Sequence, residues 1–131
     1  MEITELLYAE THEWTHLAND GDTKVATIGL TAHAIEALTD LVYMDLPTAG
    51  TAVSSGQPFG EVESVKATSD LYSPVDGEII DVNTSLPDNL DTLNTDPYGE
   101  GWIIKVKLND EASLAKLMNL EDYEKMCGEV D

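Results

Sequence analysis

Lys66 is the residue best suited by its position in the sequence to hold a covalently attached group. It stands between two β-rich arms and is the only lysine between Lys24 and Lys105, so no neighbouring amine competes with it. A tight strand-turn-strand segment puts one side chain at its tip, where a modifying enzyme can reach it and a long adduct can swing. From spacing alone, however, the simpler interpretation is a solvated surface lysine that only aids solubility.

Other residue types that commonly perform catalysis give no positive indication. Cys127 is the only cysteine, so no intramolecular disulfide can form, and the acids around it disfavour a reactive thiolate. The three histidines, His12, His16 and His33, are predicted to form no metal site. No Walker, dinucleotide-binding or Gly-x-Ser-x-Gly motif occurs.

The charge balance excludes some classes of partner. Asp and Glu number 26 against 6 for Lys plus Arg, which gives a formal net charge of −20 at pH 7. Binding to nucleic acid requires clustered basic residues, which this chain lacks, and its negative charge would repel anionic lipid headgroups. The acidity favours either basic partner surfaces or simply a solvated coat suited to a salty cytoplasm, and composition does not separate these two.

Length and hydropathy predict a single domain, residues 1–131, in the cytoplasm. With 42% hydrophobic residues, the chain buries enough surface to fold without disulfides or a structural metal. No uncharged apolar run approaches the roughly 18 residues that cross a bilayer. The first residues lack the basic and apolar parts of a signal peptide.

Short runs rich in Val, Ile, Tyr, Trp and Thr recur between turn residues, as in small all-β barrels and sandwiches. In the last run, Trp102, Ile104, Val106 and Leu108 alternate with Ile103, Lys105 and Lys107, which predicts one buried and one solvent-facing side. The Asn-Asp-Gly-Asp segment at 19–22 is predicted to close a hairpin. The predicted strands are 5–8, 13–17, 25–29, 42–46, 58–65, 77–82 and 102–108.

Helices are predicted in two regions. Thr31 can cap a short helix near 31–38. Near 113–127, segments 113–118 and 121–127 are predicted to form consecutive C-terminal helices, with Gly128 ending the second.

The remaining segments are assigned by their composition. Residues 83–101 are rich in turn formers and are predicted to form an extended surface loop. Trp14 and Trp102 are expected to anchor the core, because a small domain needs their area. His12 and His16 are expected to alternate with Trp14 on an exposed strand face.

The segment around Lys66 resembles a known family. The residues Glu-Ser-Val-Lys-Ala-Thr-Ser-Asp at 63–70, followed by Ser-Pro-Val-Asp-Gly-Glu at 73–78, are similar to the lipoyl-lysine hairpin of the glycine cleavage system H protein family. Related biotinyl modules carry Met on each side of the lysine, and acyltransferase lipoyl domains usually carry Asp before it and Ala after it. Those modules are also shorter than this chain. Further resemblance lies in segments 8–14, 26–31, 41–47 and 96–102.

This resemblance implies a fold and a cofactor. The fold is a lipoyl-domain-like flattened barrel or sandwich of two small antiparallel sheets, a barrel-sandwich hybrid, with the hairpin core at about 58–82. The N-terminal strands and the C-terminal helical extension would pack on that core. Lipoic acid would be joined to Lys66 through an amide. Its strained, exposed disulfide is of the labile kind that opens readily.

The resemblance also implies a carrier rather than an enzyme. The arm would take a methylamine group from glycine decarboxylase, the P protein, and deliver it to the aminomethyltransferase, the T protein. Dihydrolipoyl dehydrogenase, the L protein, would reoxidise the dithiol, and a lipoyl ligase or transferase would attach the cofactor. A carrier that visits several enzymes in turn is expected to be a monomer.

By family position, four residues are expected to form a pocket for the loaded arm. The ammonium end of the arm needs acceptors that are shielded from water, which calls for one or two carboxylates. Glu13 and Asp70 would pair with this cation, His33 would line the cleft, and Thr11 would supply a hydroxyl where relatives commonly have Ser.

Two alternatives remain open. A lipoate relay protein would bear the same modified Lys66 but would donate lipoyl groups to other carriers and need no amine pocket. A pure binding module would leave Lys66 unmodified.

Overall fold

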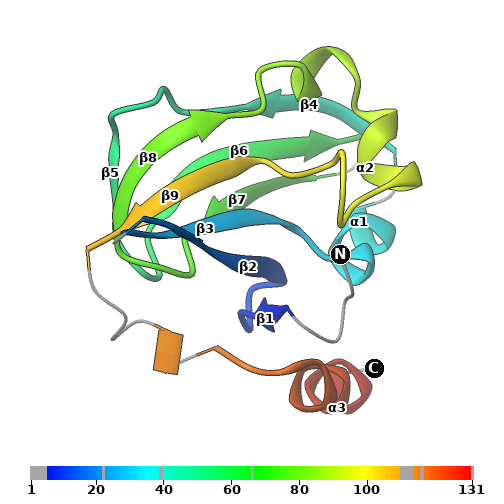
Figure 1. Cartoon of the computed structure of the whole chain (residues 1–131). Coiled ribbons are helices and arrows are strands. Elements are labelled where there is room, and N and C mark those ends of the chain that lie inside the picture. Colours follow the sequence, from blue (N-terminus) through cyan, green and yellow to red (C-terminus); the bar gives the residue numbers. More distant parts are fainter. Residues whose placement is uncertain are drawn as a thin grey trace.

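The computed structural model describes residues 6–21, 23–38, 40–65, 67–109, 114–115 and 117–130. Within these ranges the strands form two antiparallel sheets, one in the order β1-β2-β3-β9-β8-β5 and one in the order β4-β6-β7 (Figure 1). The predicted mainly β sandwich is therefore confirmed. The strands are β1 (Leu7–Tyr8), β2 (Glu13–Asp20), β3 (Thr23–Leu30), β4 (Leu41–Asp45), β5 (Ala52–Val53), β6 (Pro58–Ser64), β7 (Thr68–Tyr72), β8 (Gly77–Val82) and β9 (Ile104–Leu108).

β2 and β3 form the hairpin that was expected around 19–22. Its strands are longer than predicted, because they stay paired as far as Asp20 and Thr23. Gly21 adopts a φ of +65°, which suits the short connection of an antiparallel hairpin. Asp22 lies outside the described residues.

Gly29 is required where this hairpin passes Trp14. The two residues are cross-strand partners, and a Cβ added at Gly29 would lie 2.6 Å from Cε2 and Cζ2 of the indole. Overpacking of this kind destabilises by about 1–3 kcal/mol, so we expect Gly29→Ala to lower the free energy of unfolding by that amount in urea. Thr27→Ala, on the same strand, is the control. Wild-type stability of the Gly29→Ala variant would contradict the tight contact.

The main core lies between the two sheets. The predicted alternation is confirmed within β9, where Ile104 and Val106 are buried while the lysines that alternate with them are not. It is wrong for Ile103, which was expected on the solvent-facing side but precedes the strand and is fully buried in the main core. Strands of both sheets contribute fully buried side chains, including Ile28, Val62, Leu71, Ile104 and Val106.

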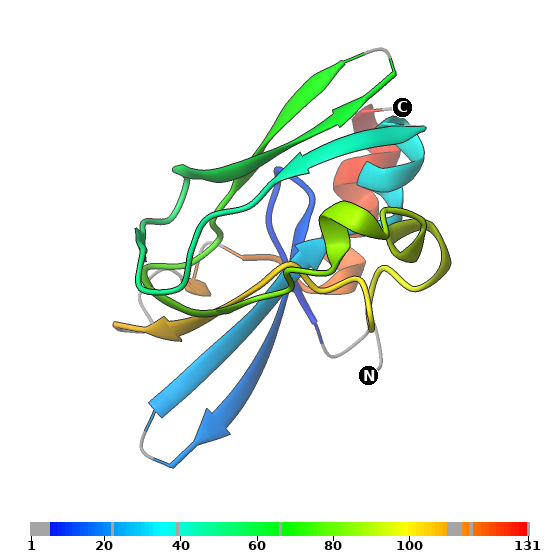
Figure 2. The same cartoon turned by 90° about the horizontal axis from the view of Figure 1, so that it is seen from above.

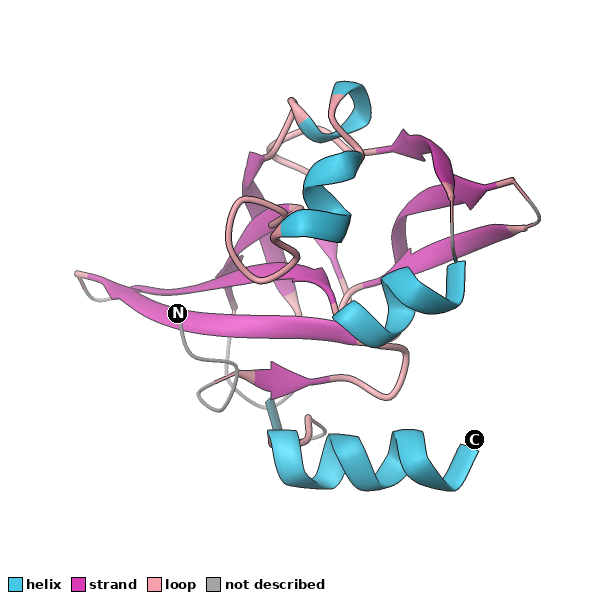
Figure 3. Cartoon of the chain, turned by 90° about the vertical axis from the view of Figure 1, so that its right-hand side faces the viewer, coloured by secondary structure: helices cyan, strands magenta, loops and turns pink. Residues whose placement is uncertain are grey.

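A second apolar cluster covers the outer face of the six-stranded sheet, where α3 (Leu120–Val130) lies beneath β1 (Figure 3). Trp14 is completely buried in it, as expected, whereas Trp102 is only partly buried. Glu13, Trp14 and Thr15 are each 1% exposed or less. His16, which was expected on an exposed face of β2, is half-buried, so that expectation is wrong.

Segment 83–101 differs from the expected extended loop. It contains the 3-10 helix η2 (Leu86–Asp88) and the helix α2 (Asp91–Thr95). Leu86 and Leu93 are buried in the main core. Two buried leucines thus anchor a segment whose other residues favour turns.

The helical predictions are partly confirmed. α1 (Ala32–Leu38) begins as expected, with the Thr31 hydroxyl accepting a 3.2 Å hydrogen bond from the Ala34 N–H. The predicted helix at 113–118 is wrong where it is described, because 114–115 form a short 3-10 turn and Met118 forms a β-bridge with Tyr8. Residues 110–113 and 116 lie outside the described residues. α3 continues past Gly128, since one glycine destabilises a helix by only about 1 kcal/mol.

Candidate functional site

A cleft of about 130 Å³ opens where the loop before β2, helix α1 and strands β6 and β7 meet. Three of the four predicted pocket residues line it: Thr11 and Glu13 from the amino-terminal region and Asp70 from β7. Most of the remaining wall is apolar, so the polar groups are concentrated in one part. The other lining residues are His12, Leu30, Ala34, Ala37, Leu38, Val62, Ser69 and Leu71.

Glu13 is a buried acid in the wall of this cleft. Its residue is 1% exposed, and its carboxyl group accepts hydrogen bonds from the Thr11 hydroxyl and the backbone N–H of Tyr72. Burial raises the pKa of Glu13 to about 8, and these hydrogen bonds offset that rise only in part. The side chain is therefore mostly protonated and neutral at pH 7.

Asp70 supplies an exposed carboxylate to the same cleft. It lies on β7, opposite Glu61 of β6. A small cleft with apolar walls and two carboxyl groups suits a ligand that has a hydrocarbon chain and an ammonium end. The structure thus brings together Thr11, Glu13 and Asp70, and their function toward a ligand remains a proposal.

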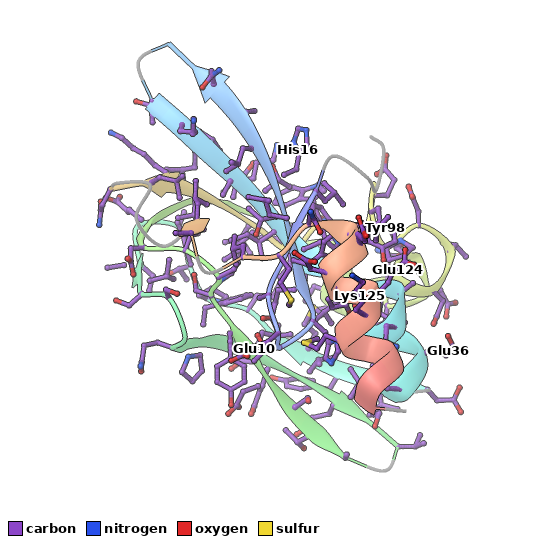
Figure 4. The ribbon with its side chains drawn as sticks, turned by 90° about the horizontal axis from the view of Figure 1, so that it is seen from below. Glu10, His16, Glu36, Tyr98, Glu124 and Lys125 are labelled. Atoms are coloured by element: carbon purple, nitrogen blue, oxygen red, sulfur yellow. The ribbon has the colours of Figure 1, made fainter. Side chains whose placement is uncertain are left out.

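His33 is not among the residues that line the cleft. Its ring centroid lies 4.8 Å from that of His12, which does line the cleft. His12 is half-buried, precedes β2 and does not lie on an exposed strand face. The expectation that His12 lies on an exposed strand face is therefore wrong. His16 lies on β2, outside the cleft, and Figure 4 shows it apart from α3.

His12 and His16 have the H-E-x-x-H spacing that holds zinc when it lies on a helix. Here residues 13–20 form β2, so the two imidazoles are not stacked on one helix face as that site requires. Across the described residues, no group of three or more His, Cys, Asp or Glu side chains is arranged to hold a metal ion.

Asp70 belongs to the hairpin that β6 and β7 form. Figure 2 shows this hairpin pointing away from the centre of the molecule, opposite to the β2–β3 hairpin. Ser64 fastens its end, with its N–H donating to the Ala67 carbonyl at 2.8 Å and its hydroxyl accepting from the Ala67 N–H at 3.2 Å. Val65 is 66% exposed. Lys66 itself lies outside the described residues, so its function as an attachment point stays a prediction.

The family model of the glycine cleavage H-protein matches residues 6–130. The chain belongs to the glycine cleavage H-protein family. The H protein of Rhodopirellula baltica is 56% identical over 124 residues, which cover 95% of this chain and 93% of that protein. The mitochondrial H protein 2 of Arabidopsis thaliana is 46% identical over 129 residues, covering 98% of this chain and 80% of that one.

A solved structure agrees with this family. The crystal structure of the glycine cleavage system H protein from Mycobacterium marinum matches with a TM-score of 0.85 at 38% sequence identity, covering 95% of this chain and 98% of that chain. Membership in the H-protein family supports the predicted lipoyl-carrier role in the glycine cleavage system.

In the described ranges, no helix has the length and apolar character needed to cross a bilayer. H-protein relatives include bacterial and mitochondrial proteins, so family membership leaves the compartment open.

Sequence reasoning missed three contributors to this H-protein site. His12 borders the cleft, Tyr72 donates its backbone N–H to Glu13, and Tyr123 of α3 contacts His12. The bond from Tyr72 crosses from one sheet to the other, and no periodic pattern reports such a contact. Tyr123 carried a weak signal, as an aromatic residue among the charged residues of a C-terminal helix.

Proposed function

We propose that this H-protein carries lipoic acid on Lys66 and holds the methylamine group supplied by glycine decarboxylase in the cleft of Glu13 and Asp70. The observation that supports this most strongly is the buried carboxyl group of Glu13 beside the exposed carboxylate of Asp70 in an otherwise mostly apolar cleft. That cleft lies against β7, the strand that follows Lys66 in the sequence.

Each wall of the cleft has a task toward the arm. When bound, lipoic acid supplies a strained disulfide that opens to take up the amine fragment. Leu30, Val62 and Leu71 offer apolar surface to the hydrocarbon part of the arm and exclude water. The two carboxyl groups receive the ammonium end, and the Thr11 hydroxyl holds the Glu13 carboxyl in place.

The proton on Glu13 makes the cleft responsive to a cation. In the unloaded protein Glu13 is mostly neutral at pH 7, so little charge is buried there. An ammonium group within a few ångströms favours the ionised carboxylate. Glu13 therefore releases its proton when the amine enters, and the cleft gains a second negative charge only when it is needed.

The decisive experiment measures the mass of the Lys66-containing peptide. The protein is produced with a competent lipoyl ligase and lipoate, and then combined with glycine decarboxylase, the aminomethyltransferase and dihydrolipoyl dehydrogenase. We expect the lipoyl mass increment on Lys66 and release of carbon dioxide from glycine. An unmodified Lys66 would support the pure binding module. Lipoylation with transfer to other carriers, but no carbon dioxide release, would support the relay.

Asp70→Asn is expected to shorten the lifetime of the methylamine-loaded protein about two- to fivefold. The neutral amide cannot pair with the ammonium, and an ion pair at an exposed site contributes up to about 1 kcal/mol. The measurement is the decay of the loaded form followed by mass spectrometry. Asp45→Asn, at an exposed position of β4 in the same sheet, is the matched control. An unchanged lifetime for Asp70→Asn would remove Asp70 from the proposal.

The relay alternative requires the same lysine but has no amine to shield. The pairing of Glu13 with Asp70 in one cleft therefore favours glycine cleavage over the relay. We also propose that the chain acts as a monomer in the cytoplasm, since it has to visit its partners one after another.

A further inference from the structure

Tyr123 connects α3 to the wall of the cleft. It is 4% exposed and stacks on Tyr8 with ring centroids 4.8 Å apart. Its hydroxyl lies 2.6 Å from Nδ1 of His12 and 2.7 Å from Oγ1 of Thr31. The loop before β2, the start of α1 and the C-terminal helix therefore meet at one hydroxyl group, next to a residue that lines the cleft.

The backbone of His12 is held in an unusual conformation. Its φ of +74° makes it the one non-glycine residue with positive φ among the described residues. The His12 N–H donates to the Ala9 carbonyl at 2.9 Å, and its carbonyl accepts from the Thr31 N–H at 3.0 Å. Such strain persists only where neighbouring contacts impose it, and it concentrates at functional sites.

Counting hydrogens gives a direction to the chain of hydrogen bonds that runs from the Thr31 hydroxyl through the Tyr123 hydroxyl to His12, called here the hydroxyl chain. Thr31 Oγ1 accepts from the Ala34 N–H, and among the described residues the Tyr123 hydroxyl is its other hydrogen-bond partner, so the Thr31 hydrogen is satisfied when it is donated to Tyr123. Tyr123 then has its own hydrogen to donate across the 2.6 Å contact to Nδ1 of His12, which places the ring hydrogen on Nε2. A second proton on this imidazole would make Nδ1 a donor to Tyr123, so the Tyr123 hydrogen would have to turn away from His12 to another acceptor.

The titratable groups around His12 agree with a neutral imidazole. Tyr123 faces it from α3, His33 from α1, and Glu13 and Asp70 share the cleft with it. Burial, and then the neighbouring His33, hold the pKa of His12 below its usual value. With Glu13 mostly protonated at pH 7, Asp70 is the charged group in the part of the cleft that His12 borders.

We propose that His12 is a positioning residue of the arm cleft, kept neutral and in the Nε2–H form by the hydroxyl chain from Thr31 through Tyr123. This rests on the proposed function, because a neutral imidazole matters only if the cleft receives a cation. An imidazolium at this place would repel the ammonium end of the arm. Through Tyr123, α3 thereby controls the charge of a cleft to which α3 itself contributes no described lining residue.

The first test needs neither lipoate nor glycine. Nitrogen NMR of the unmodified protein is expected to show His12 in the Nε2–H form. Tyr123→Phe is expected to raise the His12 pKa by roughly one pH unit, the size expected when one hydrogen bond to the neutral ring is lost. Tyr43→Phe removes a hydroxyl from an exposed tyrosine on β4 and should leave the titration unchanged. An Nδ1–H form in the wild type, which requires no variant to fold, would overturn the proposal.

The second test uses the lipoylated, methylamine-loaded protein. Tyr123→Phe is expected to shorten its lifetime several-fold more at pH 6 than at pH 8, because a raised pKa of His12 leaves more of the imidazole charged at the lower pH. Equal losses at both pH values would indicate a merely structural role and would refute the assignment. If the NMR result holds while the wild type itself never becomes loaded, the proposed function fails and the hydroxyl chain stands.

Discussion

Lys66→Arg is expected to abolish lipoylation and, with it, all glycine decarboxylation that depends on this chain. Attachment requires a neutral amine that can form an amide, and the guanidinium group stays protonated and unreactive under these conditions. Intact mass after incubation with ligase and lipoate should show no increment. Carbon dioxide release in the reconstituted system should fall to the level measured without the chain.

The control for this variant is Lys107→Arg, at an exposed position of β9 that alternates with buried residues. Both variants are expected to keep the wild-type circular dichroism spectrum and urea midpoint, because a Lys-to-Arg exchange keeps the charge and nearly the length of the side chain. Lipoylation of the Lys66→Arg protein at another residue, with decarboxylation retained, would disprove the assignment of Lys66.

Glu13→Gln is expected to gain stability relative to the wild type as the pH rises. From pH 5 to pH 8, the difference in unfolding free energy between the unloaded variant and the unloaded wild type should shift in favour of the variant by about 3 kcal/mol. The unfolded carboxyl loses its proton near its ordinary pKa of 4.5, whereas the folded one keeps it up to about pH 8. Between these values the unfolded state binds fewer protons, so wild-type stability falls as pH rises, by up to about 1.4 kcal/mol per unit. Glutamine has no proton to lose and does not show this fall.

Urea unfolding of the two proteins at several pH values measures the difference directly. Glu10→Gln removes one charge from an exposed residue in the turn just before β2, so it corrects for the net charge of −20. If wild type and Glu13→Gln lose stability in parallel from pH 5 to pH 8, the Glu13 carboxyl is not held neutral in the fold. A stabilised Glu13→Gln variant that holds the amine poorly would show that the site sacrifices stability for binding.

Several features of this protein followed from its sequence. Alternation at 104–107, the hairpin around Gly21 and the capped helix after Thr31 rest on local chemistry, which acts between residues close along the chain. The family was visible because the segment 63–78 and its flanking motifs keep both residue types and order. The residue types at Thr11, Glu13 and Asp70 were also readable, and the structure brings them into one cleft.

The environment of those residues was decided only by tertiary structure. Glu13 looks like one of many acids in the sequence, and it becomes neutral because the loop before β2, helix α1 and strands β6 and β7 surround its carboxyl group. The contact between His12 and Tyr123 joins residues 111 positions apart. Desolvation depends on everything that surrounds a group, and packing between distant segments leaves no period in the chain, so neither could be predicted from residue order.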